Sequence, residues 1–243
     1  MNKLMACLKF DLRLLKSSWK IALIMFVVVI TVFIAFRNPV FLIFSSMLIA
    51  TIIVSFSFIK IDKNNIDALQ STLAKRKTVL TSRYLIAFFV LLVTAIVIFF
   101  LSWFMVSVFS EHIWLNYMEN YILGGSVIVK LFFVTAMMFC ISALVVAVQY
   151  PLFFKFKSSN IATIAPMMIV LILFSIYFFM GMDSNMETVF AMLIHRISGA
   201  FSLPPRERGF VLLGFSGGLI ITGFLLMWIS TLISNQIYKR KEF

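Results

Sequence analysis

Six long apolar stretches without a single charged residue constrain the fold of this chain more than any other feature. They are Ile21–Phe36, Asn38–Ile59, Tyr84–Ser110, Leu131–Phe154, Ser158–Met182 and Gly209–Tyr238. All but the first exceed the roughly 20 residues that a helix needs to cross a hydrocarbon core about 30 Å thick. The first has 16 residues, and Trp19, Lys20 and Arg37 can extend it by reaching the interface. The sequence therefore predicts an all-α integral membrane protein with six transmembrane helices, spanning about residues 19–36, 39–61, 84–109, 127–149, 160–182 and 209–234.

The Lys and Arg residues between these stretches predict the orientation. If the N-terminus is inside, sixteen of them fall on the inner side and four on the outer side, with Lys130 at the outer end of the fourth span. Such an excess in short loops marks the cytoplasmic side, so both termini are expected there. The net charge of +12 is then mostly charge at the inner membrane surface, where it is attracted to anionic lipid. It requires no nucleic-acid partner. We expect one multi-pass membrane domain, residues 1–243.

The chain lacks the groups that a membrane enzyme needs. With 63% hydrophobic residues in 243, it leaves no room for a soluble catalytic domain. It contains no HExxH or GxSxG motif, so it lacks the reacting groups of those hydrolases. It also lacks the glycine-rich phosphate-binding motif, so it cannot hydrolyse ATP alone. His112 and His195 have no third ligand nearby, so no metal site is predicted. No cofactor is expected on this chain, and any ATP-driven work requires a separate subunit.

Ion-coupled transport is disfavoured by the same inventory. No Asp, Glu, His or Arg lies near the centre of any predicted span. Ion- and proton-coupled carriers generally place an ionisable group there, although backbone carbonyls can serve for Na⁺. A gradient-driven transporter and a non-transport immunity or scaffold protein therefore remain as alternatives.

The first 18 residues predict a helix that lies in the membrane plane. One stripe is apolar, and Lys9, Arg13, Lys16 and Lys20 flank it, which is the pattern of an interfacial helix. The stripe consists of Leu4, Met5, Leu8, Leu12 and Leu15. Phe10 and Leu14 break this pattern and are candidates for contact with another helix.

Two connections on the inner side are candidates for binding a soluble partner. In the connection 62–83, Asn64 and Asp67 have the spacing of a helix cap, and apolar residues recur at helical spacing after it. The alternative for this segment is a solvated basic loop. Pro151 is expected to end the fourth span or to start a new turn, followed by an aromatic and basic segment to Lys157 that can dock a partner or anchor at the interface. The predicted coupling residues are Asn64, Asp67, Ala68, Gln70, Ser71, Lys75, Arg76, Lys77, Phe153, Phe154 and Lys155.

Other segments suggest a pathway, a helix contact and an outer cap. Phe and Met are abundant, at 29 and 15 residues, and provide soft, adaptable contacts for hydrophobic cargo. The candidate pathway residues are Phe44, Met47, Phe56, Met167, Phe174 and Phe178, each of which can equally face lipid or pack in a core. Gly214 and Gly218, with Gly217 and Gly223, give the sixth span a smooth face for close helix packing. The outer connection 183–208 predicts a short amphipathic helix over Met186–Ser198.

Together these features resemble the membrane subunit of small bacterial ABC-type exporters. The closest match is Leu69–Leu85, with the L-x-S-x-L run at its start, Arg76-Lys77 within it and Arg83-Tyr84-Leu85 at the membrane entry. The family usually has a proline shortly before the Arg-Lys pair, where this chain has Ala74 and Lys75. The resemblance implies an in-plane elbow helix at Lys3–Ser18 and short cytoplasmic coupling helices at Asn64–Lys77 and Pro151–Lys157.

The resemblance also implies partners and a type of cargo. It implies two permease copies, identical or different, and a cytoplasmic ATP-binding subunit that holds ATP and Mg²⁺. Some exporters of this kind carry amphipathic peptides such as the phenol-soluble modulins. The expected function is therefore ATP-driven export of an amphipathic or hydrophobic peptide or drug.

Overall fold

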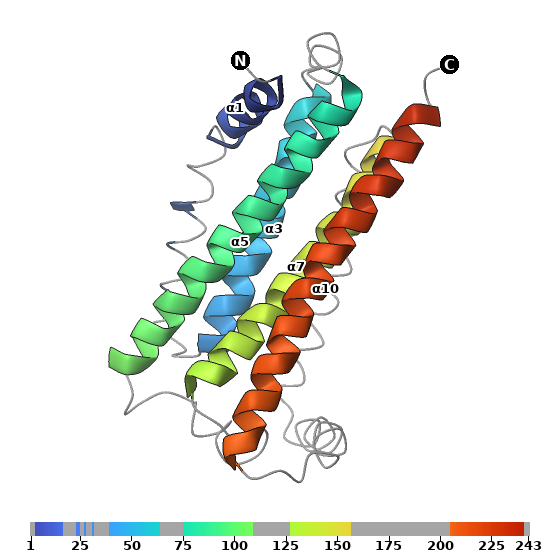
Figure 1. Cartoon of the computed structure of the whole chain (residues 1–243). Coiled ribbons are helices and arrows are strands. Elements are labelled where there is room, and N and C mark those ends of the chain that lie inside the picture. The colour runs from blue at the N-terminus through green and yellow to red at the C-terminus, as the bar shows by residue number, and fades with distance from the viewer. Residues whose placement is uncertain are drawn as a thin grey trace, which may run out of the picture.

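The computed structural model describes five helices that form one bundle (Figure 1). They are α1 (Lys3–Lys16), α3 (Pro39–Lys63), α5 (Arg76–Val108), α7 (Val127–Phe156) and α10 (Pro205–Arg240). The structure describes residues 3–16, 39–63, 75–108, 127–156 and 205–240, together with residues 23, 24, 27 and 31. Those residues contain helices and no strand. The first and fifth predicted spans and the predicted outer helix over Met186–Ser198 lie largely or wholly outside these residues.

The apolar composition of these helices matches a membrane fold. Three of the described helices are long and apolar enough to cross a membrane, over Lys77–Val108, Ile128–Lys155 and Leu212–Ile237. The helix α3 adds a shorter apolar stretch, Leu42–Ser55. The all-helical membrane fold is thereby confirmed, while the total of six spans stays a prediction.

The bundle is organised around α7, which packs against α3, α5 and α10. Helices α3, α7 and α10 run in one direction and α5 runs in the other (Figure 1). The buried share of the most apolar 18-residue stretch is 56% in α7, 33% in α5 and 22% in α10. The exposed surfaces of α5 and α10 carry large apolar side chains such as Phe89, Phe104 and Phe224. An apolar exterior of this kind is what a helix presents to lipid or to another membrane protein.

The buried residues of α3 are mostly aliphatic, and aromatic rings line the contact between α5, α7 and α10. Phe88 of α5 makes edge-to-face contacts with Phe139 of α7 and Phe224 of α10, with ring centroids 6.0 Å and 5.3 Å apart. Gly223 of α10 faces this cluster, since a Cβ added there would lie 3.1 Å from Cε1 of Phe139. A residue without a side chain is therefore what allows α10 to approach α7 at this level.

α1 packs against the beginning of α5, but the side of α1 that faces α5 is not the apolar stripe. Met5 and Leu12 of that stripe are about half exposed, at 56% and 49%. The residues that face α5 are Cys7, which packs against Val79, and Asp11. α1 therefore has an apolar side open to the surroundings and a second side bound to the bundle.

Two helices begin or continue beyond the expected limits. α5 begins at Arg76, eight residues before the predicted span, and the carbonyl of Lys75 accepts hydrogen bonds from the N–H groups of Thr78 and Val79. α7 continues through Pro151 to Phe156, so the expected break at Pro151 does not occur. A proline removes one N–H from a helix, and the structure supplies another donor for the carbonyl concerned, as described below.

Candidate functional site

α1 and the last turns of α10 lie at the same end of the bundle, called here the α1 end (Figure 1). A group of buried polar side chains from α1, α5, α7 and α10 is joined there by hydrogen bonds. Three consecutive residues of α5, Ser82, Arg83 and Tyr84, are all buried there. Successive residues of a helix point about 100° apart, so the three face different neighbours. We call them the α5 hub, because Ser82 bonds α1, the Arg83 carbonyl bonds α7 and Tyr84 bonds α10.

The bond to α1 involves a buried carboxylate. The hydroxyl of Ser82 donates to Oδ2 of Asp11 at 2.7 Å. Ser82, Asp11 and Arg83 are 0%, 6% and 4% exposed. Burial and the charge of Asp11 raise the pKa of the Cys7 thiol, and the charge of Arg83 opposes that shift, so both charges lie near Cys7. A buried carboxylate with hydrogen-bond and charged neighbours fixes the position of α1 against α5.

The bond to α7 comes from Tyr150. Its hydroxyl donates to the carbonyl oxygen of Arg83 at 3.2 Å. Its ring packs against the ring of Tyr84, with centroids 4.3 Å apart. The two tyrosines therefore join α5 and α7 at the level where Tyr84 also reaches α10.

The bonds to α10 form a chain whose hydrogen positions follow from counting protons. The Ser230 hydroxyl donates to the carbonyl of Ala147 at 2.6 Å, because a carbonyl can only accept. The single proton of Ser230 is thereby used, so Tyr84 donates to Ser230 across 2.5 Å. Ser234 then donates to Tyr84 across 2.8 Å. The chain runs in one direction, from Ser234 through Tyr84 and Ser230 to Ala147, and ties together α10, α5 and α7.

The end point of this chain explains how α7 continues past its proline. In an α-helix, the carbonyl of residue 147 would accept from the N–H of residue 151. Pro151 has no N–H, and Ser230 of α10 donates to that carbonyl instead. Inside a membrane protein, groups freed by proline are satisfied in this way by neighbouring side chains. The side chain of α10 therefore stabilises the last two turns of α7.

A second polar contact joins the parallel helices α3 and α7 near the same end. The Ser55 hydroxyl lies 2.8 Å from Oε1 of Gln149 and 2.8 Å from the carbonyl of Thr51. It has one proton to share between two acceptors, so turning the Gln149 amide over, with its nitrogen donating to Ser55, satisfies both contacts. Gln149 is fully buried, and its Nε2, as placed, has no hydrogen-bond partner among the described residues.

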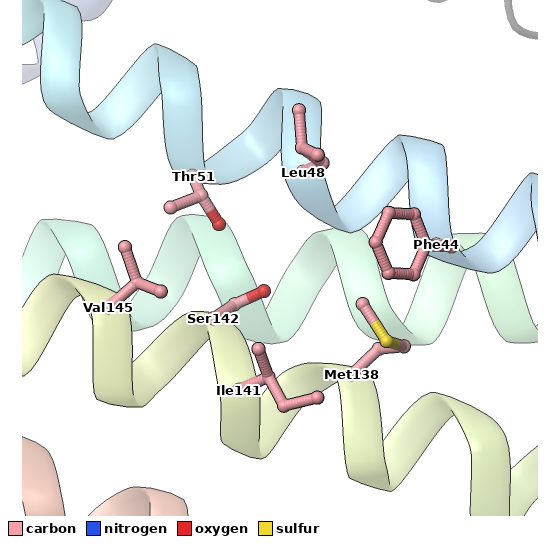
Figure 2. Close-up of a pocket in the computed structure, with 7 residues that line it drawn as sticks. All are labelled: Phe44, Leu48, Thr51, Met138, Ile141, Ser142 and Val145. Carbon is pink, nitrogen blue, oxygen red and sulfur yellow. The ribbon is translucent and has the colours of Figure 1, made fainter. Parts of the chain in front are cut away.

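A small cavity of about 30 Å³ lies farther along the same interface. It has room for one or two water-sized groups. Its lining comes from α3 and α7, and Figure 2 shows the ring of Phe44 beside the side chain of Met138. The lining residues are Phe44, Leu48, Thr51, Met138, Ile141, Ser142 and Val145.

The predicted coupling residues divide between the described helices and the segment that precedes α5. Lys75 precedes α5, and Arg76 and Lys77 form its first turn, so they share one helix with the α5 hub. Phe153 and Phe154 are buried at the end of α7, and Lys155 is exposed beside them. Asn64, Asp67, Ala68, Gln70 and Ser71 lie outside the described residues.

The predicted pathway and packing residues do not come together in the described part of the chain. Phe44 borders the cavity, whereas Met47 is fully buried in the hydrophobic core. The side chain of Phe56 and the residues Met167, Phe174 and Phe178 lie outside the description. Gly214 and Gly218 are exposed, with no described atom within 4 Å of an added Cβ. Among the described glycines, the close contact is made by Gly223.

The residues of the α5 hub and their partners escaped the sequence analysis. Ser82-Arg83-Tyr84 has the composition of an interfacial entry to a span, and Asp11 stands among four basic residues of an amphipathic helix. Pro151 was the sequence feature that could have indicated them. A proline within a membrane helix leaves a carbonyl without its N–H donor, so a neighbouring helix must supply one. Ser230 of α10 supplies it, and Ser234 on the same helix face bonds Tyr84.

Comparison with known proteins defines the family. No curated protein and no solved structure matches the chain significantly. The family model described as ABC-2 family transporter protein matches residues 8–239. That match covers all five described helices, apart from the first five residues of α1 and the final residue of α10. The chain is therefore a member of the ABC-2 family of transporter membrane proteins.

Proposed function

We propose that this chain is the permease subunit of an ATP-driven exporter and forms its pathway with a second permease copy. Membrane proteins of this family normally work with a cytoplasmic ATP-binding subunit. The chain has no phosphate-binding motif of its own, so that subunit must supply ATP hydrolysis. The membrane is that of a bacterial cell, and the α1 end faces the cytoplasm, where the excess of Lys and Arg is expected.

The observation that carries the proposal is the continuity of α5. The helix has 33 residues, from Arg76 to Val108, and extends about 50 Å at 1.5 Å per residue. Its first turn belongs to the segment proposed to dock the ATPase. A movement of that segment is therefore carried along one helix across the whole membrane, without a flexible joint.

The second proposed contact with the ATPase lies at the end of α7. Lys155 is exposed there, while Phe153 and Phe154 anchor the same turn in the core. The rings of these two phenylalanines meet edge to face, 5.5 Å between centroids. An exposed cation on an anchored turn is suited to receive an acidic partner without moving away from the bundle.

The cargo that this chemistry favours is an amphipathic or hydrophobic peptide or drug. The cavity between α3 and α7 is far too small for such a molecule, so we place the pathway between two permease copies. Phe44 and the abundant Met and Phe side chains supply apolar, adaptable contacts. Whether the two copies are identical does not affect this arrangement.

Purification from the native membrane in mild detergent, followed by an ATPase assay, tests the proposal. We expect a stoichiometric ATP-hydrolysing subunit to co-elute with the tagged chain. Acidic or bulky replacements at Ala68, Gln70 and Arg76 should separate ATP hydrolysis from transport, whereas Thr222→Val, on an exposed part of α10, should not. Elution of the chain without any nucleotide-hydrolysing partner would overturn the proposal.

A further inference from the structure

We infer that Tyr84 is a positioning residue for transport, because its hydroxyl links movement of α5 to movement of α10. The inference rests on the proposed function, in which the ATPase acts on the beginning of α5. It adds a route by which that action reaches α10. The route consists of two hydrogen bonds at the Tyr84 hydroxyl, one donated to Ser230 and one accepted from Ser234.

The position of Tyr84 along α5 gives the first argument. It lies eight residues, a little over two turns, after Arg76, so little bending is possible between the docking segment and this hydroxyl. Tyr84 is 5% exposed, and its ring is held against the ring of Tyr150. A movement of the first turns of α5 therefore carries the Tyr84 hydroxyl with it.

The way in which α10 is held gives the second argument. Along α10 the hydroxyls of Ser216, Thr222 and Thr231 bond to carbonyls of their own helix. Ser230 and Ser234 are different, since both meet Tyr84, and Ser230 also bonds α7. α10 packs mainly against α7 and much less against α5. The two hydrogen bonds at Tyr84 are therefore a substantial part of the direct link between α5 and α10.

The direction of the hydrogen-bond chain gives the third argument. Every hydroxyl proton from Ser234 to Ala147 has an assigned acceptor, so the chain cannot lose Tyr84 without leaving a group without its partner. Loss of the Tyr84 hydroxyl removes both the donor to Ser230 and the acceptor for Ser234 together. The link to α10 is then broken, while α5 keeps its bond to α1 through Ser82 and its bond to Tyr150 through the Arg83 carbonyl.

Two cysteine labels at the far end of the bundle can separate the movements of α5 and α10. Ser107 and Leu213 are exposed there, on α5 and α10 respectively. In the complex with its ATPase, S107C and L213C each report a maleimide labelling rate, with and without ATP and vanadate. Labelling of the chain with only its native Cys7 and Cys140 is subtracted; burial raises the pKa of Cys7, which slows its reaction.

We expect Tyr84→Phe to reduce the nucleotide-dependent change at Leu213 about eightfold, the factor that corresponds to two interhelical hydrogen bonds of average strength in a membrane protein. The change at Ser107 and the ATPase rate should persist, which a general loss of structure would not produce. Ser216→Ala, which removes a hydroxyl bonded within α10, is the matched control and should leave both labels unchanged.

The outcomes separate the inference from the proposed function. An unchanged response at Leu213 in Tyr84→Phe, with the response at Ser107 intact, would overturn the inference and leave the proposed function standing. A wild-type complex with no nucleotide-dependent change at either label would count against the proposed function itself. If Tyr84→Phe does not assemble, Ser234→Ala removes one of the two bonds and should reduce the Leu213 response alone; no reduction there overturns the inference as well.

Discussion

Ser230 of α10 donates its hydroxyl to the carbonyl oxygen of Ala147 in α7 at 2.6 Å, and this carbonyl is the one that Pro151 leaves without its usual helical donor. The two helices are thereby joined at a point where α7 would otherwise kink or end. The same serine receives a hydrogen bond from Tyr84, so the repair of α7 and the contact with the α5 hub share one side chain.

The first prediction follows because the Ser230 hydroxyl takes the place of the N–H that Pro151 lacks. Ser230→Ala should lower the free energy of unfolding by about 0.6–1.7 kcal/mol, the range measured for hydrogen bonds between membrane helices. Pro151→Ala restores an N–H at residue 151 and should reduce the cost of Ser230→Ala. The free energy of unfolding in mixed micelles is measured for the wild type, the two single variants and the double variant. Together the four values give the coupling energy between the two positions. Additive effects would show that the two donors do not serve the same carbonyl.

The second prediction concerns the attachment of α1. Asp11→Ala leaves the buried Ser82 hydroxyl without its acceptor and should cost about 1–3 kcal/mol. Asp11→Asn keeps an oxygen in place and should cost less. Lys9→Ala, at an exposed position of the same helix, is the control. The melting temperature in detergent checks the order; equal stability of Asp11→Ala and the Lys9 control would contradict the contact.

The third prediction compares two glycines of α10. Gly223→Ala brings a Cβ to 3.1 Å from Phe139, a residue held in place by the rings around it, and should be less stable than Gly218→Ala. At Gly218 no described atom lies within 4 Å of the added Cβ, and alanine is the better helix former by about 1 kcal/mol. The two melting temperatures decide the matter, and a Gly223→Ala protein at least as stable as Gly218→Ala would show that α10 and α7 have room at this level.

The fourth prediction concerns the buried amide of Gln149. Gln149→Met removes a polar group that is incompletely satisfied within the described residues and keeps a similar volume, so the melting temperature should stay the same or rise. Ser55 keeps the Thr51 carbonyl as its acceptor. Gln149→Glu places a charge in the same buried position and serves as the contrasting variant, with a clear loss of stability expected. A marked loss of stability in Gln149→Met would show that the amide is fully paired.

The helical membrane fold was predictable from the sequence because it depends on hydropathy alone. The charge-free stretches located α3, α5, α7 and α10, since backbone groups in lipid must be satisfied within helices. The ends were less predictable: Pro151 predicted a break that α10 prevents, through a serine 79 positions later in the chain. The bonds of Ser82 and Tyr84 were not predictable, because hydropathy does not say which helix each residue of a span faces. For the same reason, spacing could not show that Gly223 makes the close helix contact while Gly214 and Gly218 do not.

Flux into proteoliposomes tests the central claim most directly. The probe is a fluorescently labelled amphipathic helical peptide, and the samples are the chain alone and the chain with its co-purified ATPase. The account predicts movement of the peptide only when the ATPase and MgATP are both present, and a reduced yield per ATP hydrolysed in Tyr84→Phe. Peptide movement by the chain alone, driven by a proton or sodium gradient and indifferent to ATP, would contradict it.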